Sequence, residues 1–116
     1  MIISSVSENK DLEKRISITP EIAKKYIDLG FEVQLSKNYG QHIGFKAKEY
    51  EELGVKFIGD DKELIENANI IVQLSLLSED KISLLKPNQI FIGVLNPYEN
   101  KNKLHELAKK KLIYFL

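Results

Sequence analysis

Three polar residues that follow apolar runs are the side chains of this sequence best placed to do chemistry. Arg15 follows the apolar stretch MIISSV and a polar connection, Ser75 directly follows NIIVQL, and Asn96 directly follows QIFIGVL. Arg15 is the only arginine, since lysine supplies every other basic side chain. The planar fork of an arginine binds a carboxylate, amide or phosphate group through two hydrogen bonds, which a lysine cannot do. Arg15 is therefore a candidate ligand-binding residue.

The same residues also have structural interpretations. Arg15 could pair with Glu8, Glu13 or another carboxylate and hold its loop in place, and the residues alone do not choose between this role and ligand binding. A polar residue directly after a strand usually serves as a turn or capping residue, and this role is favoured for Ser75 and Asn96 when each is considered alone. Their positions in the fold therefore matter.

The elements that must position these residues alternate between strands and helices. One helix begins at Thr19 and Pro20, a hydroxyl cap followed by a proline suited to the first turn, and ends at Gly30. Further helices are predicted at 46–53, from Asp60 or Asp61, after Ser78, and around Leu104, Leu107 and Ala108. Strands are predicted at 1–6, 31–35, 55–58, 69–74, 89–95 and 112–116. This order predicts an α/β fold, a doubly wound, mostly parallel sheet with helices on both faces.

Two strands, NIIVQL and QIFIGVL, are nearly continuous apolar runs, which are typical of parallel strands covered on both faces. We expect them at the centre of the sheet. FEVQL alternates strictly between apolar and polar residues, which favours a strand near the sheet margin. Ligands of an open parallel sheet bind outside the carboxyl ends of its strands, where Arg15, Ser75 and Asn96 are expected to lie.

Composition excludes several classes of function. The 116 residues suffice for one domain, and 17 basic and 17 acidic side chains give a formal net charge of zero, so no electrostatic argument favours nucleic acid. The chain has no cysteine, which removes thiolate chemistry and suits a cytoplasmic location. His42 and His105 are too few for a histidine metal cluster. The glycines form no phosphate-binding loop, so the chain lacks its own dinucleotide fingerprint.

The two ends of the chain carry separate signals. The start, MIISSVSENK, lacks the features of a signal peptide, and no apolar run approaches the roughly 18 residues that span a bilayer, so no direct membrane insertion is expected. The end, LIYFL, has the composition of a buried strand and no turn or polar exit after it. We therefore expect the natural polypeptide to continue, so that residues 1–116 form a single domain that is a fragment of a longer chain. A short natural chain with a terminal strand is the alternative.

The sequence also resembles a known family. It is similar to the N-terminal region shared by alanine dehydrogenases and the alpha subunit of proton-translocating NAD(P) transhydrogenases in the stretches EKRISITPEIAKKYIDLGFEVQLSKNYGQHIGF, YEELGVKFI, ANIIVQLSLLSEDKISLLKPNQIFIGVLNPYEN and LHELAKKKL. The resemblance covers essentially the whole chain. Its most specific part is the combination of RISITP with the downstream LGFEV.

The resemblance implies that this region is the first of two Rossmann-like domains and that an NAD-binding domain follows it. The cleft between the domains would hold the reactive nicotinamide, with Arg15, Ser75 and Asn96 as cofactor-binding candidates on this side. NAD and NADP would be bound mainly by regions outside this chain. The implied partners are a membrane and NADP-binding subunit and a second copy in a homodimer, at the cytoplasmic face of the inner membrane. No catalytic or metal-binding residue is expected within 1–116.

Two positions distinguish the branches of the family. The alanine dehydrogenases that this sequence resembles carry a substrate-binding lysine where it has Ser75 and a catalytic histidine where it has Asn96, and their arginine at the position of Arg15 helps to hold the substrate carboxylate. Serine has no positive charge, and asparagine does not titrate as a general acid or base. Hydride transfer between two nicotinamides needs only the positioning of the rings. The resemblance therefore favours the transhydrogenase alpha subunit, with the 116-residue chain inactive alone.

Two other functions stay open. One is an amino-acid dehydrogenase of the alanine or saccharopine type, against which the missing lysine and histidine count. The other is a stand-alone flavodoxin-like binding or assembly module without catalysis. It predicts that no dinucleotide-binding sequence follows Leu116 in the reading frame.

Overall fold

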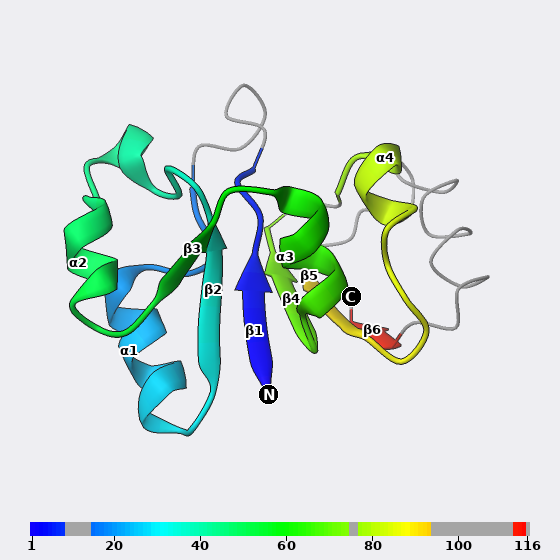
Figure 1. The fold of residues 1–116 in the computed structure, drawn as a ribbon, viewed down its shortest axis with the longest axis horizontal. Coiled ribbons are helices and arrows are strands. Elements are labelled where there is room, and N and C mark those ends of the chain that lie inside the picture. The colour runs from blue at the N-terminus through cyan, green and yellow to red at the C-terminus, as the bar shows by residue number, and fades with distance from the viewer. Residues whose placement is uncertain (9–14, 75–76, 94–112, 116) are drawn as a thin grey trace.

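A parallel sheet forms the centre of the molecule. The structure, a computed structural model, describes residues 1–8, 15–74, 77–93 and 113–115. Six strands lie in the order β3-β2-β1-β4-β5-β6, and every neighbouring pair is parallel (Figure 1). They are β1 (Ile2–Ser5), β2 (Glu32–Ser36), β3 (Lys56–Ile58), β4 (Ile70–Gln73), β5 (Ile90–Gly93) and β6 (Ile113–Phe115). This order confirms the predicted doubly wound sheet, and the direction of strand addition reverses between β1 and β4.

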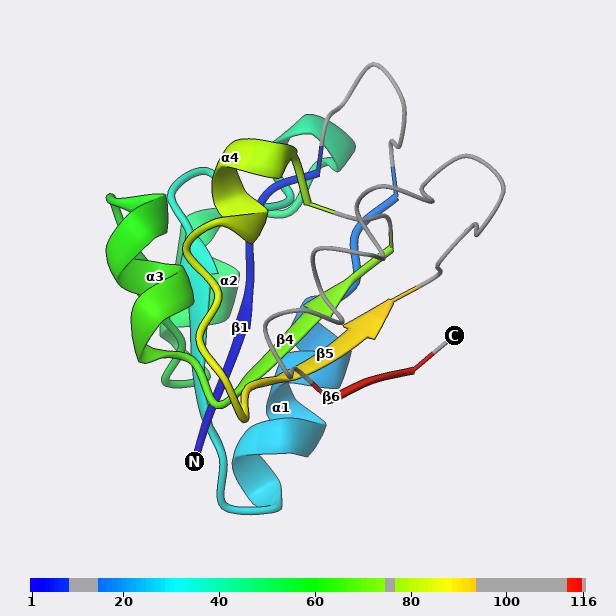
Figure 2. The same cartoon turned by 90° about the vertical axis from the view of Figure 1, so that its right-hand side faces the viewer.

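Helices cover both faces of this sheet, with α1 on the face opposite α3 and α4 (Figure 2). The helices are α1 (Pro20–Asp28), the 3-10 helix η1 (Gln41–Ile43), α2 (Ala47–Glu51), α3 (Asp61–Asn67) and α4 (Glu79–Ile82). Under α1 and α2 the buried core comprises Ile3, Ile18, Ala23, Val33, Leu35, Tyr39, Tyr50 and Val55. Under α3 and α4 it comprises Val6, Leu64, Ile65, Ala68, Ile71, Leu77, Ile82, Leu85 and Phe91. Each face of the sheet therefore packs its own apolar cluster against a layer of helices.

Local signals in the sequence set the ends of the helices. The Thr19 hydroxyl accepts a hydrogen bond from the amide of Ile22 at 3.3 Å, Pro20 opens α1, and the helix ends before Gly30, whose φ is 98°. Asp60 caps α3 by accepting from the amide of Lys62 at 2.9 Å. These contacts confirm the predicted helix starts, because free N–H groups in a first turn need such acceptors.

The centre of the sheet confirms one of the two predicted central strands. β4, formed by NIIVQL, lies there as expected, whereas its central neighbour is β1, and β5 lies one place further out, between β4 and β6. Ile92 of β5 is 40% exposed. β1 ends in the buried Ser5, whose hydroxyl lies 3.0 Å from the Tyr39 hydroxyl and 3.1 Å from Gln73 Oε1. A buried polar group costs little when it is paired.

The other predictions on the fold have clear outcomes. FEVQL forms β2, which lies beside the edge strand β3 as expected near the margin, although its polar Gln34 is only 9% exposed. The predicted helix around Leu104, Leu107 and Ala108 lies outside the described residues. Within the described ranges, no helix has the length and apolar character needed to cross a membrane.

Candidate functional site

The candidate site is the carboxyl edge of the sheet, which we define as residues 5–8, 15–18, 36–40 and 73–74. These segments follow the parallel strands β1, β2 and β4 or lead into α1, so they meet at one end of the sheet. Arg15 is exposed and stands two residues before Ser17, whose amide is bonded into this edge. Ser75 and Asn96, the other predicted site residues, lie outside the described residues. The roles of all three residues in ligand binding therefore stay predictions.

Gln73, the last residue of β4, joins the ends of β4 and β1. Its Oε1 accepts from the amide of Val6 at 2.7 Å and from the hydroxyl of Ser5 at 3.1 Å. Its Nε2 donates to the carbonyl of Val6 at 3.0 Å and to Glu8 Oε1 at 3.1 Å. Gln73 is 3% exposed, so one buried amide group satisfies both backbone atoms of Val6 where β1 leaves the sheet.

Glu8 is a second link between the same two segments. The carboxylate is 8% exposed, and its Oε1 accepts from the amide of Leu74 at 2.6 Å in addition to the bond from Gln73. Glu8 lies after β1, and Leu74 lies after β4 directly before Ser75 in the chain. Two N–H donors on one oxygen replace the water that this carboxylate gives up on burial. Glu8 thus fixes the backbone that leads to Ser75.

Tyr39 holds the segment that follows Arg15. Its hydroxyl accepts from the amides of Ser17 and Ile18, both at 3.1 Å, and lies 3.0 Å from the hydroxyl of Ser5. The side chain is 1% exposed. Two consecutive amides leading into α1 therefore find their acceptor on one phenol oxygen, which makes their position depend on Tyr39.

The turn after β2 directs the Tyr39 side chain inward. Asn38 and Gly40, on either side of Tyr39, have left-handed φ values of 64° and 77°. A Cβ at Gly40 would lie 3.1 Å from the Tyr50 hydroxyl, which itself donates to the Ile18 carbonyl at 2.8 Å. Glycine and asparagine tolerate such conformations better than other residues. The conformation of this turn therefore depends on the asparagine at position 38 and the glycine at position 40.

A third polar group joins the ends of β1, β2 and β3. The Ser36 hydroxyl accepts from the amide of Ser7 at 2.9 Å and donates to Asp61 Oδ1 at 3.1 Å. Lys81 of α4 lies 3.2 Å from Asp61 Oδ2. These contacts connect α3 and α4 to the loop after β1, so the carboxyl edge is also braced on the face of the sheet that α3 and α4 cover.

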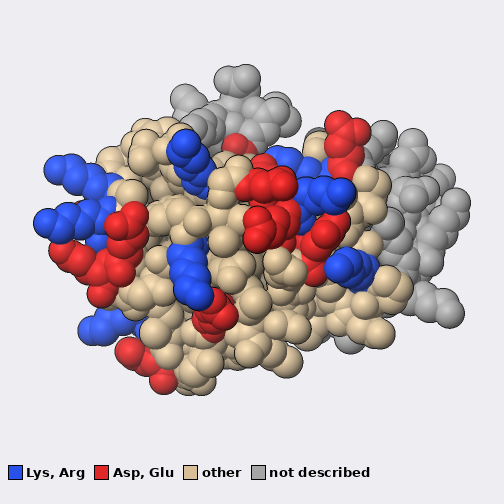
Figure 3. All heavy atoms as spheres, in the orientation of Figure 1, with Lys and Arg blue, Asp and Glu red and all other residues tan. Residues whose placement is uncertain are grey.

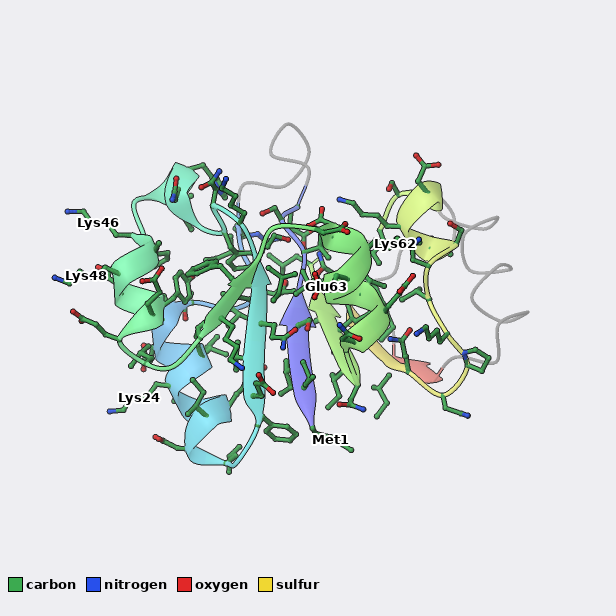
Figure 4. All side chains as sticks on the ribbon, in the orientation of Figure 1. Met1, Lys24, Lys46, Lys48, Lys62 and Glu63 are labelled. Carbon is green, nitrogen blue, oxygen red and sulfur yellow. The ribbon has the colours of Figure 1, made fainter. Side chains whose placement is uncertain are left out.

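Charges on the outer surface are mixed in sign. Acidic and basic side chains are interspersed over the face in Figure 3. Lys24, Lys46 and Lys48 point outward on the side of α1 and α2 (Figure 4). Lys56 pairs with Glu32 at 3.0 Å and, together with the hydrogen bond from Gln34, lowers the pKa of that carboxyl. The described residues on the face in view therefore offer no concentrated positive patch for a polyanion.

Burial controls the ionisation of the two core tyrosines. Removal from water raises the pKa of Tyr39 above its ordinary value, against the opposing effect of the hydrogen bonds that it accepts from the amides of Ile18 and Ser17. Burial also raises the pKa of Tyr50, and the neighbouring Tyr39 adds to that increase. Both phenols therefore stay protonated in the folded chain at pH values where exposed tyrosines begin to ionise.

This shift predicts a loss of stability in alkali. Above about pH 10 the unfolded chain releases tyrosine protons that the folded chain retains, so the free energy of unfolding falls by up to about 1.4 kcal/mol per pH unit for each tyrosine. Urea unfolding of the chain at a series of pH values measures this slope. The variants Tyr39→Phe and Tyr50→Phe should each have a shallower slope, and an unchanged slope in both would show that these tyrosines do not cause it.

Gln73, Glu8 and Tyr39, whose hydrogen bonds hold this edge together, were not selected from the sequence as site residues. Gln73 carried a usable signal, because a polar residue at the end of an apolar strand covered on both faces must find a partner. Tyr39 carried none, since an isolated tyrosine in a turn is equally compatible with exposure. The Gln73–Val6 bond joins residues 67 positions apart in the chain, and the Tyr39–Ser17 bond joins residues 22 positions apart.

Comparison with known proteins now identifies the family. Residues 5–115 match the family model described as alanine dehydrogenase/PNT, N-terminal domain. The chain belongs to this family. The resemblance of RISITP and LGFEV is thereby confirmed at the level of the family. Membership does not by itself choose between the two activities in the family's description.

Curated relatives come from both branches. An NAD(P) transhydrogenase subunit alpha of Rickettsia prowazekii is 36% identical over 119 residues, covering 99% of this chain and 31% of the relative. Alanine dehydrogenase 1 of Staphylococcus aureus is 29% identical over 109 residues, covering 94% of this chain and 29% of the relative. The chain thus spans about a third of the length of these relatives.

Solved structures agree on the fold. The transhydrogenase of Sinorhizobium meliloti superimposes with a TM-score of 0.90 at 25% identity, over 99% of this chain and 34% of that one. An L-alanine dehydrogenase has the same TM-score of 0.90 at 18% identity, over 98% of this chain and 31% of that one. The fold of this domain is therefore shared by the transhydrogenase and the alanine dehydrogenase. Side chains, rather than the fold, must distinguish the two branches.

Proposed function

We propose that this chain is the N-terminal part of the alpha subunit of a proton-translocating NAD(P) transhydrogenase. The complete enzyme would transfer hydride between NAD(H) and NADP(H). The observation that carries this proposal is the pair Ser75 and Asn96, which stand where the resemblance expects a lysine and a histidine in an alanine dehydrogenase. The identity of 36% with a transhydrogenase alpha subunit supports the same choice.

The chemistry explains why these two residues matter. Oxidative deamination of an amino acid requires proton transfer at the substrate amine and carbinol, as well as a cation for its carboxylate. Serine and asparagine provide neither. In transhydrogenation the hydride leaves one dihydronicotinamide and enters the other oxidised ring, so the protein must bring the two rings together and exclude water. Such a site needs orienting contacts rather than a general base.

The carboxyl edge fits a role in orientation. Gln73, Glu8 and Tyr39 direct polar groups to one another and to backbone at this edge, and Arg15 is an exposed side chain on one of the segments that they hold. We therefore propose that Arg15, with Ser75 and Asn96, faces the nicotinamide across a cleft to a second domain. NAD would be bound mainly by that domain and NADP by a membrane-attached partner subunit. The subunit would work as a homodimer at the cytoplasmic face of the inner membrane.

The first test is hydride transfer from NADH to an NADP analogue by the complete protein with its partner subunit. We expect activity there, and neither activity nor micromolar NADH binding in the 116-residue chain. Replacement of Arg15 by glutamine should lower the transfer rate about tenfold because the oriented fork is lost. Lys24→Gln, which removes a positive charge from an exposed side chain of α1, is the matched control and should leave the rate unchanged.

Other outcomes of this assay point to the other functions. Reduction of pyruvate with ammonia and NADH, in the absence of transhydrogenation, would instead establish an alanine dehydrogenase, the activity of the relative at 29% identity. A complete protein with neither activity and no dinucleotide-binding sequence would be a non-catalytic binding module. Equal rates in Arg15→Gln and in the unmodified protein would remove Arg15 from the proposed cleft.

A further inference from the structure

We infer that Tyr39 is a positioning residue that orients Arg15 through a buried hydrogen-bond network reaching Leu74. This inference rests on the proposed function, since it assigns a role within the same cleft. We define the Tyr39 network as Tyr39, Ser5, Gln73 and Glu8. Its members come from the ends of β1, β2 and β4, and each is at most 8% exposed.

The network begins at the backbone that follows Arg15. The amides of Ser17 and Ile18 both donate to the Tyr39 hydroxyl at 3.1 Å. The carbonyl of Ile18 accepts from the Tyr50 hydroxyl at 2.8 Å. The amide and the carbonyl of Ile18 are therefore both hydrogen-bonded to tyrosine hydroxyls. Ile18 lies three residues after Arg15, so these bonds restrict the backbone from which the Arg15 side chain extends.

The direction of every bond in the network follows from the available protons. Gln73 Oε1 can only accept, so the single proton of the Ser5 hydroxyl goes to it across 3.1 Å. Ser5 must then accept from Tyr39 across 3.0 Å, and this leaves the phenol oxygen of Tyr39 to accept from the two amides. The donor and acceptor roles of Tyr39, Ser5 and Gln73 are thus possible in only one arrangement. The directions of these hydrogen bonds cannot reverse without leaving a group unpaired.

The far end of the network lies at the amide of Leu74, the last described residue before Ser75. Gln73 Nε2 donates to Glu8 Oε1 at 3.1 Å, and the same oxygen accepts from the amide of Leu74 at 2.6 Å. Leu74 directly precedes Ser75 in the chain. The network therefore connects the backbone of Ser17 and Ile18, which follows Arg15, with the backbone of Leu74.

Packing prevents Tyr39 from moving independently. Its ring contacts Tyr50 edge to face with centroids 6.2 Å apart, and the flanking left-handed residues Asn38 and Gly40 fix the turn that carries it. A rigid phenol can hold a binding residue within the narrow tolerance that hydride transfer between two rings requires. Orientation of Arg15 is therefore a consequence of the core and of the turn after β2.

The test is a double-mutant cycle in the complete protein with its partner subunit, measured at saturating NADH. Tyr39→Phe should lower the hydride-transfer rate about tenfold. In an Arg15→Gln background it should cause no further loss of rate, although its effect on thermal stability should be the same in both backgrounds. Tyr26→Phe is the matched control, because Tyr26 packs against the same core and takes no part in the network. It should leave the rate unchanged.

The outcomes separate this inference from the proposed function. Absence of hydride transfer in the unmodified protein would overturn the proposed function itself. Given that activity, an unchanged rate in Tyr39→Phe, or equal losses in both backgrounds, would overturn the positioning role alone. Ser5→Ala is the second variant if Tyr39→Phe does not fold. It interrupts the network between Tyr39 and Gln73 and should lower the rate about threefold only when Arg15 is present.

Discussion

Replacing Gln73 with methionine is expected to lower the free energy of unfolding by about 3 kcal/mol. Methionine retains the length and approximate volume of glutamine but cannot reproduce the four bonds that the amide makes to Ser5, to both backbone atoms of Val6 and to Glu8. The amide of Val6 would remain buried without an acceptor, and a buried unsatisfied group of this kind costs about 1–3 kcal/mol. Denaturant unfolding of the chain measures the change, which corresponds to a fall in melting temperature of roughly 10 °C.

Gln34→Met is the matched control for this prediction. Gln34 is also a strand glutamine with low exposure, at 9%, but its side chain donates to Glu32 Oε1 at a long 3.4 Å. We expect this substitution to change the free energy of unfolding by less than about 1 kcal/mol. Similar losses in the two variants would mean that glutamine volume in the sheet, rather than the bonds of Gln73, determines stability.

The second large effect is expected at Gly40, where alanine should lower the free energy of unfolding by about 2–3 kcal/mol. The φ of 77° disfavours any residue with a Cβ, and that Cβ would meet the Tyr50 hydroxyl at 3.1 Å and Ile16 Cδ1 at 3.3 Å. Tyr50 cannot retreat without lengthening its 2.8 Å bond to the Ile18 carbonyl. Crowding therefore adds to the backbone strain.

Gly44 separates these two contributions. Its φ is 96°, in the same left-handed region, but a Cβ there has nothing within 4 Å. Gly44→Ala should therefore show the backbone strain alone, about 1–2 kcal/mol, and Gly40→Ala should be the less stable variant by about 1 kcal/mol. Thermal unfolding of both variants, compared with the unmodified chain, gives this difference. Equal melting temperatures would indicate that the core under the turn yields to a methyl group.

Much of the fold could be predicted because its signals are local. The Thr19 cap, Pro20 and Gly30 define α1 within twelve residues of sequence, and the alternation of apolar and amphipathic segments is sufficient to predict a parallel α/β sheet. The family resemblance also depends on contiguous stretches. The predicted cofactor-binding roles of Arg15, Ser75 and Asn96 stay predictions.

The strand order and the polar network were decided by the tertiary structure. The apolar run of β5 predicted a central position for that strand, yet β1 lies beside β4 at the centre, where the Ser5 hydroxyl contacts Tyr39 from the turn after β2 and Gln73 of β4. The roles of Gln73 and Tyr39 depend on bonds between segments 67 and 22 residues apart in sequence. The sequence by itself determined which segments become helices and strands, since capping and periodicity act over a few neighbours. Only the tertiary structure determined which buried polar groups contact one another. Their hydrogen-bond partners come from strands and turns that are far apart in the chain and are brought together by folding.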